Sequence, residues 1–232
     1  MKKTILSTLV AVGLISSASA QVYFTDNFAG YSVNTNNWNV TLPQGNSAVT
    51  QNNGSLTLTD GGTITSTASF SNPLTISGSF TMDDSRDLLA IYDRSSGQLT
   101  DGLGLYIRGT VEAGSGAEVT LNEQLPNNPA TVLASVYMPI NANQTYSYVI
   151  QDNGSSYSLN LDGANIFTAS LDPSFTEGNK VQFGDGEWGG GGLGITTTLS
   201  PVSITAAPEP STYALFGLGA LALVIAYRRK VA

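Results

Sequence analysis

The sequence predicts an all-β protein, built as an antiparallel sandwich of two sheets and flanked at both ends by targeting segments. Three observations point to this fold. Gly, Ser, Thr and Asn dominate while charged residues make up only 11% of the chain, a composition that favours strands and turns over helices. Short runs of alternating polar and apolar residues recur between turn signals. Residues 21–205 show no long apolar pattern of helical period.

The first 20 residues have the three parts of a secretory signal peptide. Two lysines follow the initiator methionine, residues 4–15 form a short apolar stretch, and Ala18 and Ala20 form the small-residue cleavage pattern. We expect the Sec translocon to export the chain and signal peptidase to release a mature protein that begins at Gln21. The apolar stretch is too short to favour an uncleaved membrane helix.

The body of the chain is strongly acidic and lacks two chemically important residue types. Residues 21–212 hold four basic residues and all seventeen acidic ones, a formal charge of −13, which repels nucleic acid and anionic lipid. The chain contains no Cys and no His. These absences exclude disulfides, Ser-His-Asp triads and the usual zinc ligands. We therefore expect a protein that is not an enzyme and that does not bind nucleic acid.

Short candidate strands follow one another along the body, at residues 55–59, 74–80, 87–92, 103–107 and 132–138. The clearest local pattern is a hairpin whose strands, residues 146–150 and 157–161, flank a turn at Asp152-Asn153-Gly154. Asn-Gly supplies the positive φ that hairpin turns need. Ten or more such strands predict a two-sheet sandwich of the jelly-roll type.

Four aromatic residues of the body have two interpretations, and they are Trp38, Tyr146, Tyr148 and Tyr157. The three tyrosines could form an aromatic platform for a glycan. Aromatic side chains at alternating strand positions more often pack in the core or against the neighbouring strand. We expect the tyrosines in the core or packed against the neighbouring strand, and Trp38 in the core.

Three stretches of the body carry a resemblance to known domains. Residues 26–30, Asp-Asn-Phe-Ala-Gly, followed by Asn37-Trp38, resemble the opening of laminin-G-like and concanavalin-A-like jelly-roll domains. Residues 145–167 are similar to the late strand pair of those domains, and residues 182–184 to their near-terminal strand. The resemblance covers most of residues 22–205 and implies a jelly roll. Because that fold serves lectins, glycosidases and adhesion modules alike, it leaves the activity open.

The resemblance also implies a structural Ca²⁺ beside the first strand, with Asp26 and the Gly30 carbonyl as candidate ligands. Oxygen atoms of this kind are the ligands that Ca²⁺ prefers. Asp83, Asp84 and Asp87 form a second acidic cluster, for which a solvated turn between strands is the simpler account. Apart from Ca²⁺, we expect no cofactor.

Asp185-Gly186-Glu187-Trp188 is the most suggestive run for carbohydrate chemistry. Two carboxylates two residues apart on a strand share a face, and a Trp can stack on a sugar ring. The run is surrounded by glycines, which favour a loop, and the Glu-x-Asp-x-x-Glu signature of glycosidases with this fold is missing. We therefore treat Asp185, Glu187 and Trp188 as candidate glycan-binding residues and assign no catalytic residue.

The C-terminal segment, residues 206–232, has three parts in order: Pro208-Glu209-Pro210, an uncharged apolar run at residues 213–227, and the basic cluster Arg228, Arg229 and Lys230. A helix over the apolar run would be about 22 Å long, short of the ~30 Å hydrocarbon core of a membrane. This length suits a transient hold in the membrane better than a permanent anchor. The basic cluster should stay cytoplasmic, which leaves the body outside.

This order of parts closely resembles the PEP-CTERM sorting signal. The resemblance implies recognition by an exosortase, a membrane-embedded cysteine protease of Gram-negative bacteria that make exopolysaccharide, and removal of the tail near the Pro-Glu-Pro motif. The body would be held briefly at the inner membrane and then released to the cell surface or the extracellular space.

Three functional hypotheses follow. The first is an exported, exosortase-processed, non-enzymatic protein of the cell surface or extracellular matrix, associated with exopolysaccharide or biofilm. The second is a carbohydrate-binding, lectin-like module of the same fold, and the third is a secreted glycoside hydrolase.

Overall fold

The computed structural model describes residues 22–43, 45–97, 101–109, 118–124, 130–172, 175, 178–185 and 195–206. The predicted signal peptide lies outside these residues, as does the C-terminal sorting segment apart from its first residue, Ala206. Every regular element within them is a β-strand. The described residues contain no helix with the length and apolar character that crossing a membrane requires.

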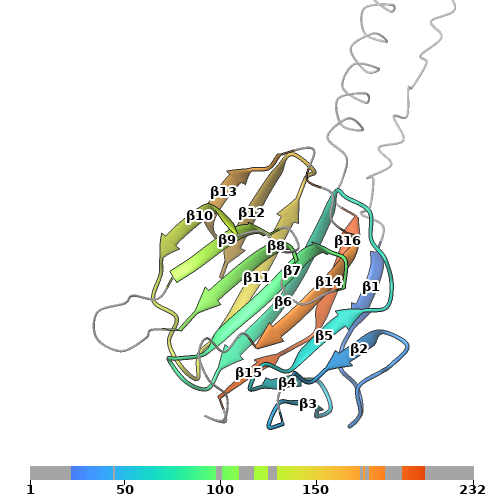
Figure 1. The fold of residues 1–232 in the computed structure, drawn as a ribbon. Coiled ribbons are helices and arrows are strands. Elements are labelled where there is room, and N and C mark those ends of the chain that lie inside the picture. The colour runs from blue at the N-terminus through green and yellow to red at the C-terminus, as the bar shows by residue number, and fades with distance from the viewer. Residues whose placement is uncertain are drawn as a thin grey trace, which may run out of the picture. The chain divides into compact units, whose positions relative to one another are not determined.

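Sixteen strands are described, and all their pairings are antiparallel (Figure 1). The first sheet has the order β13 (Ala164–Ser170), β12 (Ser156–Leu161), β11 (Thr145–Asp152), β6 (Leu74–Met82), β15 (Thr196–Leu199), β4 (Leu56–Thr59) and β3 (Ala48–Gln51), and β16 (Val202–Ala206) joins β6 to β1 (Val22–Asp26). The second sheet has the order β10 (Thr131–Tyr137), β9 (Glu118–Gln124), β8 (Gly102–Arg108), β7 (Leu88–Ser95), β14 (Lys180–Asp185), β5 (Thr63–Ser66) and β2 (Trp38–Thr41).

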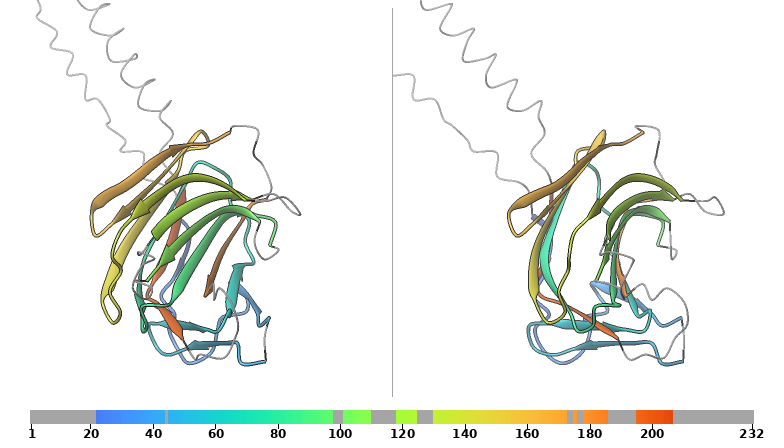
Figure 2. Two further views of the ribbon diagram at one scale, coloured as in Figure 1. Left: turned by 60° about the vertical axis from the view of Figure 1, so that its left-hand side comes forward. Right: turned by 90° about the vertical axis from the view of Figure 1, so that its left-hand side faces the viewer.

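The two sheets pack face to face, which confirms the predicted sandwich (Figure 2). Alternate residues of each strand point into a single core between them. In β11 this alternation buries Tyr146, Tyr148 and Ile150 while the residues between them face outward. The second sheet is strongly curved, and the first sheet lies on its convex side (Figure 2).

The aromatic residues expected in the core or against a neighbouring strand are all buried, as predicted. Trp38, Tyr148 and Tyr157 have at most 1% of their surface exposed, so none of them forms a glycan platform. The indole of Trp38 donates to Asp26 Oδ2 at 2.8 Å and packs edge-on against Phe24. This contact ties the first strand to the core.

The predicted hairpin is present, but its turn covers residues 153–155 and so lies one residue later in the chain than expected. Ile150 lies opposite Leu159, and the Asn153 amide donates to the Ser156 carbonyl at 2.9 Å, which closes the turn. Asp152 was predicted as a turn residue and is instead the last residue of β11, where its side chain is fully buried. The turn residues alone could not show that the Asp152 carboxylate pairs with a buried cation.

That cation is Arg94, which a β-bulge turns into the core. Tyr92 and Ser95 of β7 are three residues apart, but their partners on β14, Gln182 and Lys180, are only two residues apart. β7 therefore carries one extra residue at this point. Arg94 has a φ of +53° at this point. The side chains of the consecutive residues Asp93 and Arg94 are both buried as a result.

Candidate functional site

The candidate site is the outer face of the second sheet. The strands of this sheet carry polar side chains on that face, where they do not contribute to the core. In β8, Leu103, Leu105 and Ile107 belong to the core, so Tyr106 and Arg108 belong to the opposite face. The same alternation in the next strand gives that face its polar residues Glu118, Thr120 and Asn122, with Val119 and Leu121 in the core.

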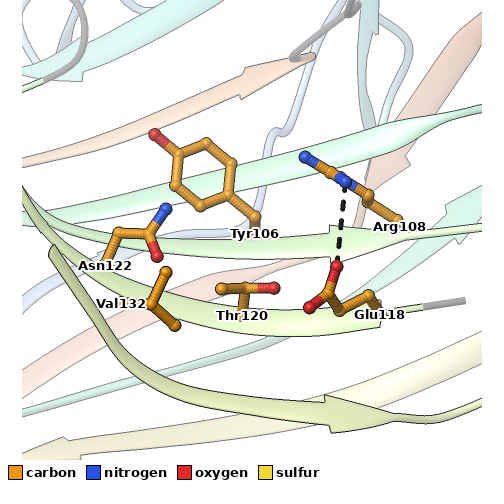
Figure 3. Close-up of a pocket in the computed structure, with 6 residues that line it drawn as sticks. All are labelled: Tyr106, Arg108, Glu118, Thr120, Asn122 and Val132. Atoms are coloured by element: carbon orange, nitrogen blue, oxygen red, sulfur yellow. Dashed lines mark ion pairs between the residues drawn. The ribbon is translucent and has the colours of Figure 1, made fainter. Parts of the chain in front are cut away.

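Strand register brings these residues together from three strands. Tyr106 lies opposite Thr120, and Asn122 lies opposite Val132 of β10. They surround a pocket of about 190 Å³, open to solvent, whose lining residues are Tyr106, Arg108, Glu118, Thr120, Asn122 and Val132 (Figure 3). A pocket this small fits one unit of a larger ligand, because sites that enclose a whole small molecule usually measure about 300–1,000 Å³.

A pair of tyrosines forms the apolar wall beside the pocket. The hydroxyls of Tyr92 and Tyr106 lie 2.9 Å apart, and their rings meet edge to face at 5.8 Å. Burial raises the pKa of both hydroxyls, so both stay neutral and serve as hydrogen-bond donors and acceptors. The rings fit because residue 104 is a glycine, since a Cβ there would lie 2.9 Å from the Tyr106 ring.

The charged side chains of the pocket compensate one another. Arg108 Nη1 lies 3.8 Å from Glu118 Oε2 (Figure 3), and the Ser135 hydroxyl donates to the other oxygen of Glu118. Both charged side chains are about one third exposed or more, so water screens the pair. Glu118 is the single carboxylate among the six lining residues. Hydrolysis of a glycosidic bond ordinarily needs two carboxylates.

Two side-chain amides on this face have polar atoms without a hydrogen-bond partner. They are Oδ1 of Asn122 and both polar atoms of Gln182 on β14, all shielded from solvent. Gln182 lies opposite Tyr92, Tyr92 lies opposite Gly104, and Gly104 lies opposite Asn122. The two amides therefore belong to one row of residues that runs across four neighbouring strands. A buried polar atom without a partner is costly, and such an atom often marks a missing water or ligand.

The glycan-binding run predicted from the sequence lies largely outside the described residues. Glu187 and Trp188 are not among them, and Asp185 is the last residue of β14, with only its backbone described. The signal-cleavage residues Ala18, Ala20 and Gln21 and the sorting residues are likewise outside. These assignments stay predictions.

The candidate calcium ligands already make several hydrogen bonds. Asp26 accepts from the Phe28 amide at 2.8 Å and from the Trp38 indole at 2.8 Å, and the Gly30 carbonyl accepts from the Asn53 amide at 2.6 Å. Within the described part of the chain, no three His, Cys, Asp or Glu side chains gather in a way that could hold a metal. Calcium at Asp26 and Gly30 stays a prediction.

The second acidic cluster is only partly a solvated turn. Asp84 pairs with Arg86 at 2.8 Å on the surface, as a turn residue would. Asp87 is instead 2% exposed and accepts from the Thr197 hydroxyl at 2.6 Å. Residues that are close in the sequence therefore have different environments in the fold. Asp84 forms an ion pair on the surface, and Asp87 makes a buried hydrogen bond.

The sequence did not single out the pocket residues. Their local signal is the alternation of Gly102–Arg108 and Glu118–Gln124, which shows which residues face outward. It does not show that Tyr106 and Val132 lie on the same face of one sheet, because this depends on the pairing of three strands.

Comparison with known families identifies a motif in the C-terminal segment. Residues 206–230 match the PEP-CTERM protein-sorting motif. This match confirms the resemblance inferred from the Pro-Glu-Pro tripeptide, the apolar run and the basic cluster. A PEP-CTERM motif implies export, transient membrane anchoring and processing by an exosortase. A search of curated protein sequences gives no match to the chain.

Solved structures similar to this chain share its fold at low sequence identity. The carbohydrate-binding module CBM66 from Bacillus subtilis is 20% identical with a TM-score of 0.53, covering 74% of this chain and 98% of its own. The Emp47p carbohydrate recognition domain is 13% identical with a TM-score of 0.61, covering 83% and 100%. An endo-β-1,3-glucanase from Pyrococcus furiosus is 9% identical with a TM-score of 0.59, covering 82% and 95%. Binding domains and a glycosidase thus share the fold.

Proposed function

We propose that this chain is an exported, exosortase-processed protein whose sandwich binds carbohydrate without cutting it. After signal-peptide removal and release of its tail, it would act at the cell surface or in the extracellular matrix, in association with exopolysaccharide. The PEP-CTERM motif supports the export route. The pocket on the outer face of the second sheet supports the binding activity.

The observation that carries the proposal is the unpartnered Oδ1 of Asn122 in the pocket wall. A rotation of the partly exposed Asn122 side chain would turn this atom into the pocket, where a sugar hydroxyl would donate to it and remove the cost of leaving it unsatisfied. Thr120 and Tyr106 add hydroxyls on the same wall, and Val132 adds an apolar surface for the C–H groups of a sugar ring. This combination of a few polar groups with an apolar wall is typical of small-molecule sites.

The choice of binding over hydrolysis rests on this chain's own carboxylates, since its structural neighbours include both classes. Glu118 is the single carboxylate among the lining residues, and its oxygens contact Arg108 and Ser135. Hydrolysis of a glycosidic bond needs a second carboxylate beside the general acid, and none of the other lining residues supplies one. This environment suits a carboxylate that accepts hydrogen bonds from sugar hydroxyls.

Affinity electrophoresis through gels containing soluble neutral polysaccharides tests this assignment. We expect at least one polysaccharide to retard the protein and Asn122→Ala to abolish the retardation. Asn160→Ala is the matched control, because Asn160 lies on β12 of the other sheet and is also partly exposed. If the two variants are retarded equally, the pocket is not the binding site. If no polysaccharide retards the wild-type protein, the binding activity itself is contradicted.

A further inference from the structure

β10 ends the second sheet beside β13 of the first sheet, and of the usual protections against pairing its own sequence supplies only a bulge in its first half (Figure 1). Its seven residues, TVLASVY, include no charge and no proline. Natural edge strands usually carry Lys or Pro, or are very short, because free N–H and C=O groups invite another strand. Among the described residues, only β9 pairs with β10.

The second half of this strand is regular and half-buried. A bulge between Val132 and Ala134 breaks the register with β9, and from Ala134 onward the pairing is continuous. Ala134, Val136 and Met138 are partly buried against the core, and Tyr137 is 69% exposed on the opposite face. The sandwich therefore leaves a line of incompletely covered apolar side chains along this edge.

We propose that two copies of this chain pair through β10, antiparallel, about a two-fold axis at Val136. Rotation about that axis places Val136 opposite its own copy, Ala134 opposite the partner's Met138, and Ser135 opposite the partner's Tyr137. Side chains that face each other in this way lie on the same side of the joined sheet, as an antiparallel ladder requires. The arrangement is isologous, so one edge satisfies both copies.

The charge distribution favours this edge over other surfaces as the contact between copies. A body with a formal charge of −13 repels its own copy at most approaches. Residues 131–140 contain no ionisable acid or base other than Tyr137, so the contact itself brings no like charges together. The buried surface would come from apolar side chains that are now half-exposed.

Pairing at β10 would also join the two pockets into one surface. Val132 lines the pocket and belongs to the strand that forms the contact. The paired second sheets would present two copies of the pocket on one continuous outer face. A long polymer with repeated units could then engage both, and binding would gain from effective concentration. The dimer does not depend on the carbohydrate proposal.

Cysteine cross-linking of the full chain tests the pairing directly, because the chain has no cysteine of its own. In Val136→Cys the two new thiols would face each other at a Cα separation of about 4.5–5.5 Å, which suits a disulfide. Val149→Cys is the matched control, a partly exposed valine on β11 in the interior of the other sheet. We expect a disulfide-linked dimer on non-reducing gels for Val136→Cys and little for Val149→Cys. Equal cross-linking would overturn the proposal.

Sedimentation equilibrium in density-matched detergent gives an independent readout. We expect the wild-type chain to dimerise and Val136→Lys to weaken the dimer at least tenfold, because the two lysines would oppose each other at the axis. Val149→Lys should leave the equilibrium unchanged. All variants keep the C-terminal apolar run, so any association through that run is common to them. A wild-type monomer, or a Val136→Lys dimer as tight as the wild type, would contradict pairing through β10.

Discussion

Arg94 on β7 and Asp152 on β11 join the two sheets through a buried bidentate ion pair. Arg94 Nε and Nη2 each donate to one oxygen of Asp152 at 2.6 Å. The two side chains are 5% and 0% exposed. Arg94 Nη1 also donates to the Phe175 carbonyl at 2.9 Å, and Nη2 to the Gly154 carbonyl at 3.1 Å. One guanidinium thus ties the hairpin of the first sheet to the bulge of the second.

Removing the carboxylate charge from this pair should destabilise the domain strongly. We expect Asp152→Asn to lower the free energy of unfolding by about 3–5 kcal/mol, because it removes the carboxylate that binds a buried guanidinium through two hydrogen bonds. Urea unfolding measures the change. Asp84→Asn is the control, since its partner Arg86 is 45% exposed and such a pair contributes about 0–1 kcal/mol. Equal losses in the two variants would show that Asp152 does not tie the sheets together.

Asp93 should make the stability of the domain fall as pH rises above its unfolded pKa. Burial, followed by the charge of Asp152, raises the pKa of Asp93 well above its usual range. A protonated Asp93 donates to the Asp152 carboxylate, which also favours the protonated form, and the other groups around it are Arg94 and Tyr157. Above about pH 4 an unfolded Asp loses its proton while the folded one keeps it, so the unfolded state is favoured increasingly.

Asp93→Asn tests this sign. Its free energy of unfolding should depend less on pH between about 4 and 8 than that of the wild type, since the titrating group is gone. Denaturant titrations across that pH range supply the measurement. A wild-type stability that rises through the range, with a variant that behaves identically, would show that Asp93 is ionised in the folded protein.

The sequence predicted the strands well because strand periodicity is local. The runs at 74–80, 103–107 and 132–138 fall within β6, β8 and near β10, and each shows its alternation without reference to any other strand. Two features were out of reach. The inward turn of Arg94 depends on an extra residue opposite β14, far along the chain. The pocket depends on the pairing of β8, β9 and β10, which no single segment encodes.

Gly104 should control the shape of the pocket wall. A Cβ at this position would lie 2.9 Å from Cε2 of Tyr106 and 3.1 Å from Cε1 of Tyr92, so Gly104→Ala must displace the tyrosine pair. We expect a loss of about 1–3 kcal/mol in unfolding free energy, typical of overpacking, together with weaker polysaccharide retardation. Gly45→Ala is the control, because a Cβ there meets no atom within 4 Å. Unchanged stability and retardation in Gly104→Ala would show that the tyrosine pair can shift without a cost in stability or binding.

The sorting motif should govern release of the body from the membrane. We expect Glu209→Ala, or deletion of residues 228–230, to leave an unprocessed form in the membrane fraction of cells that contain the exosortase. Intact-mass measurement of the exported protein checks this outcome. An exported wild-type protein that retains residues 213–232 would contradict processing at this motif.

The central claim, that the exported body binds carbohydrate without cutting it, is tested most directly by one incubation followed by two readouts. The wild-type protein is mixed with the polysaccharide that retards it, and bound protein and newly formed reducing ends are measured in the same sample. The account predicts saturable binding that Asn122→Ala abolishes, with no increase in reducing ends over time. Reducing ends that accumulate with the wild-type protein, or binding that survives in Asn122→Ala, would contradict it.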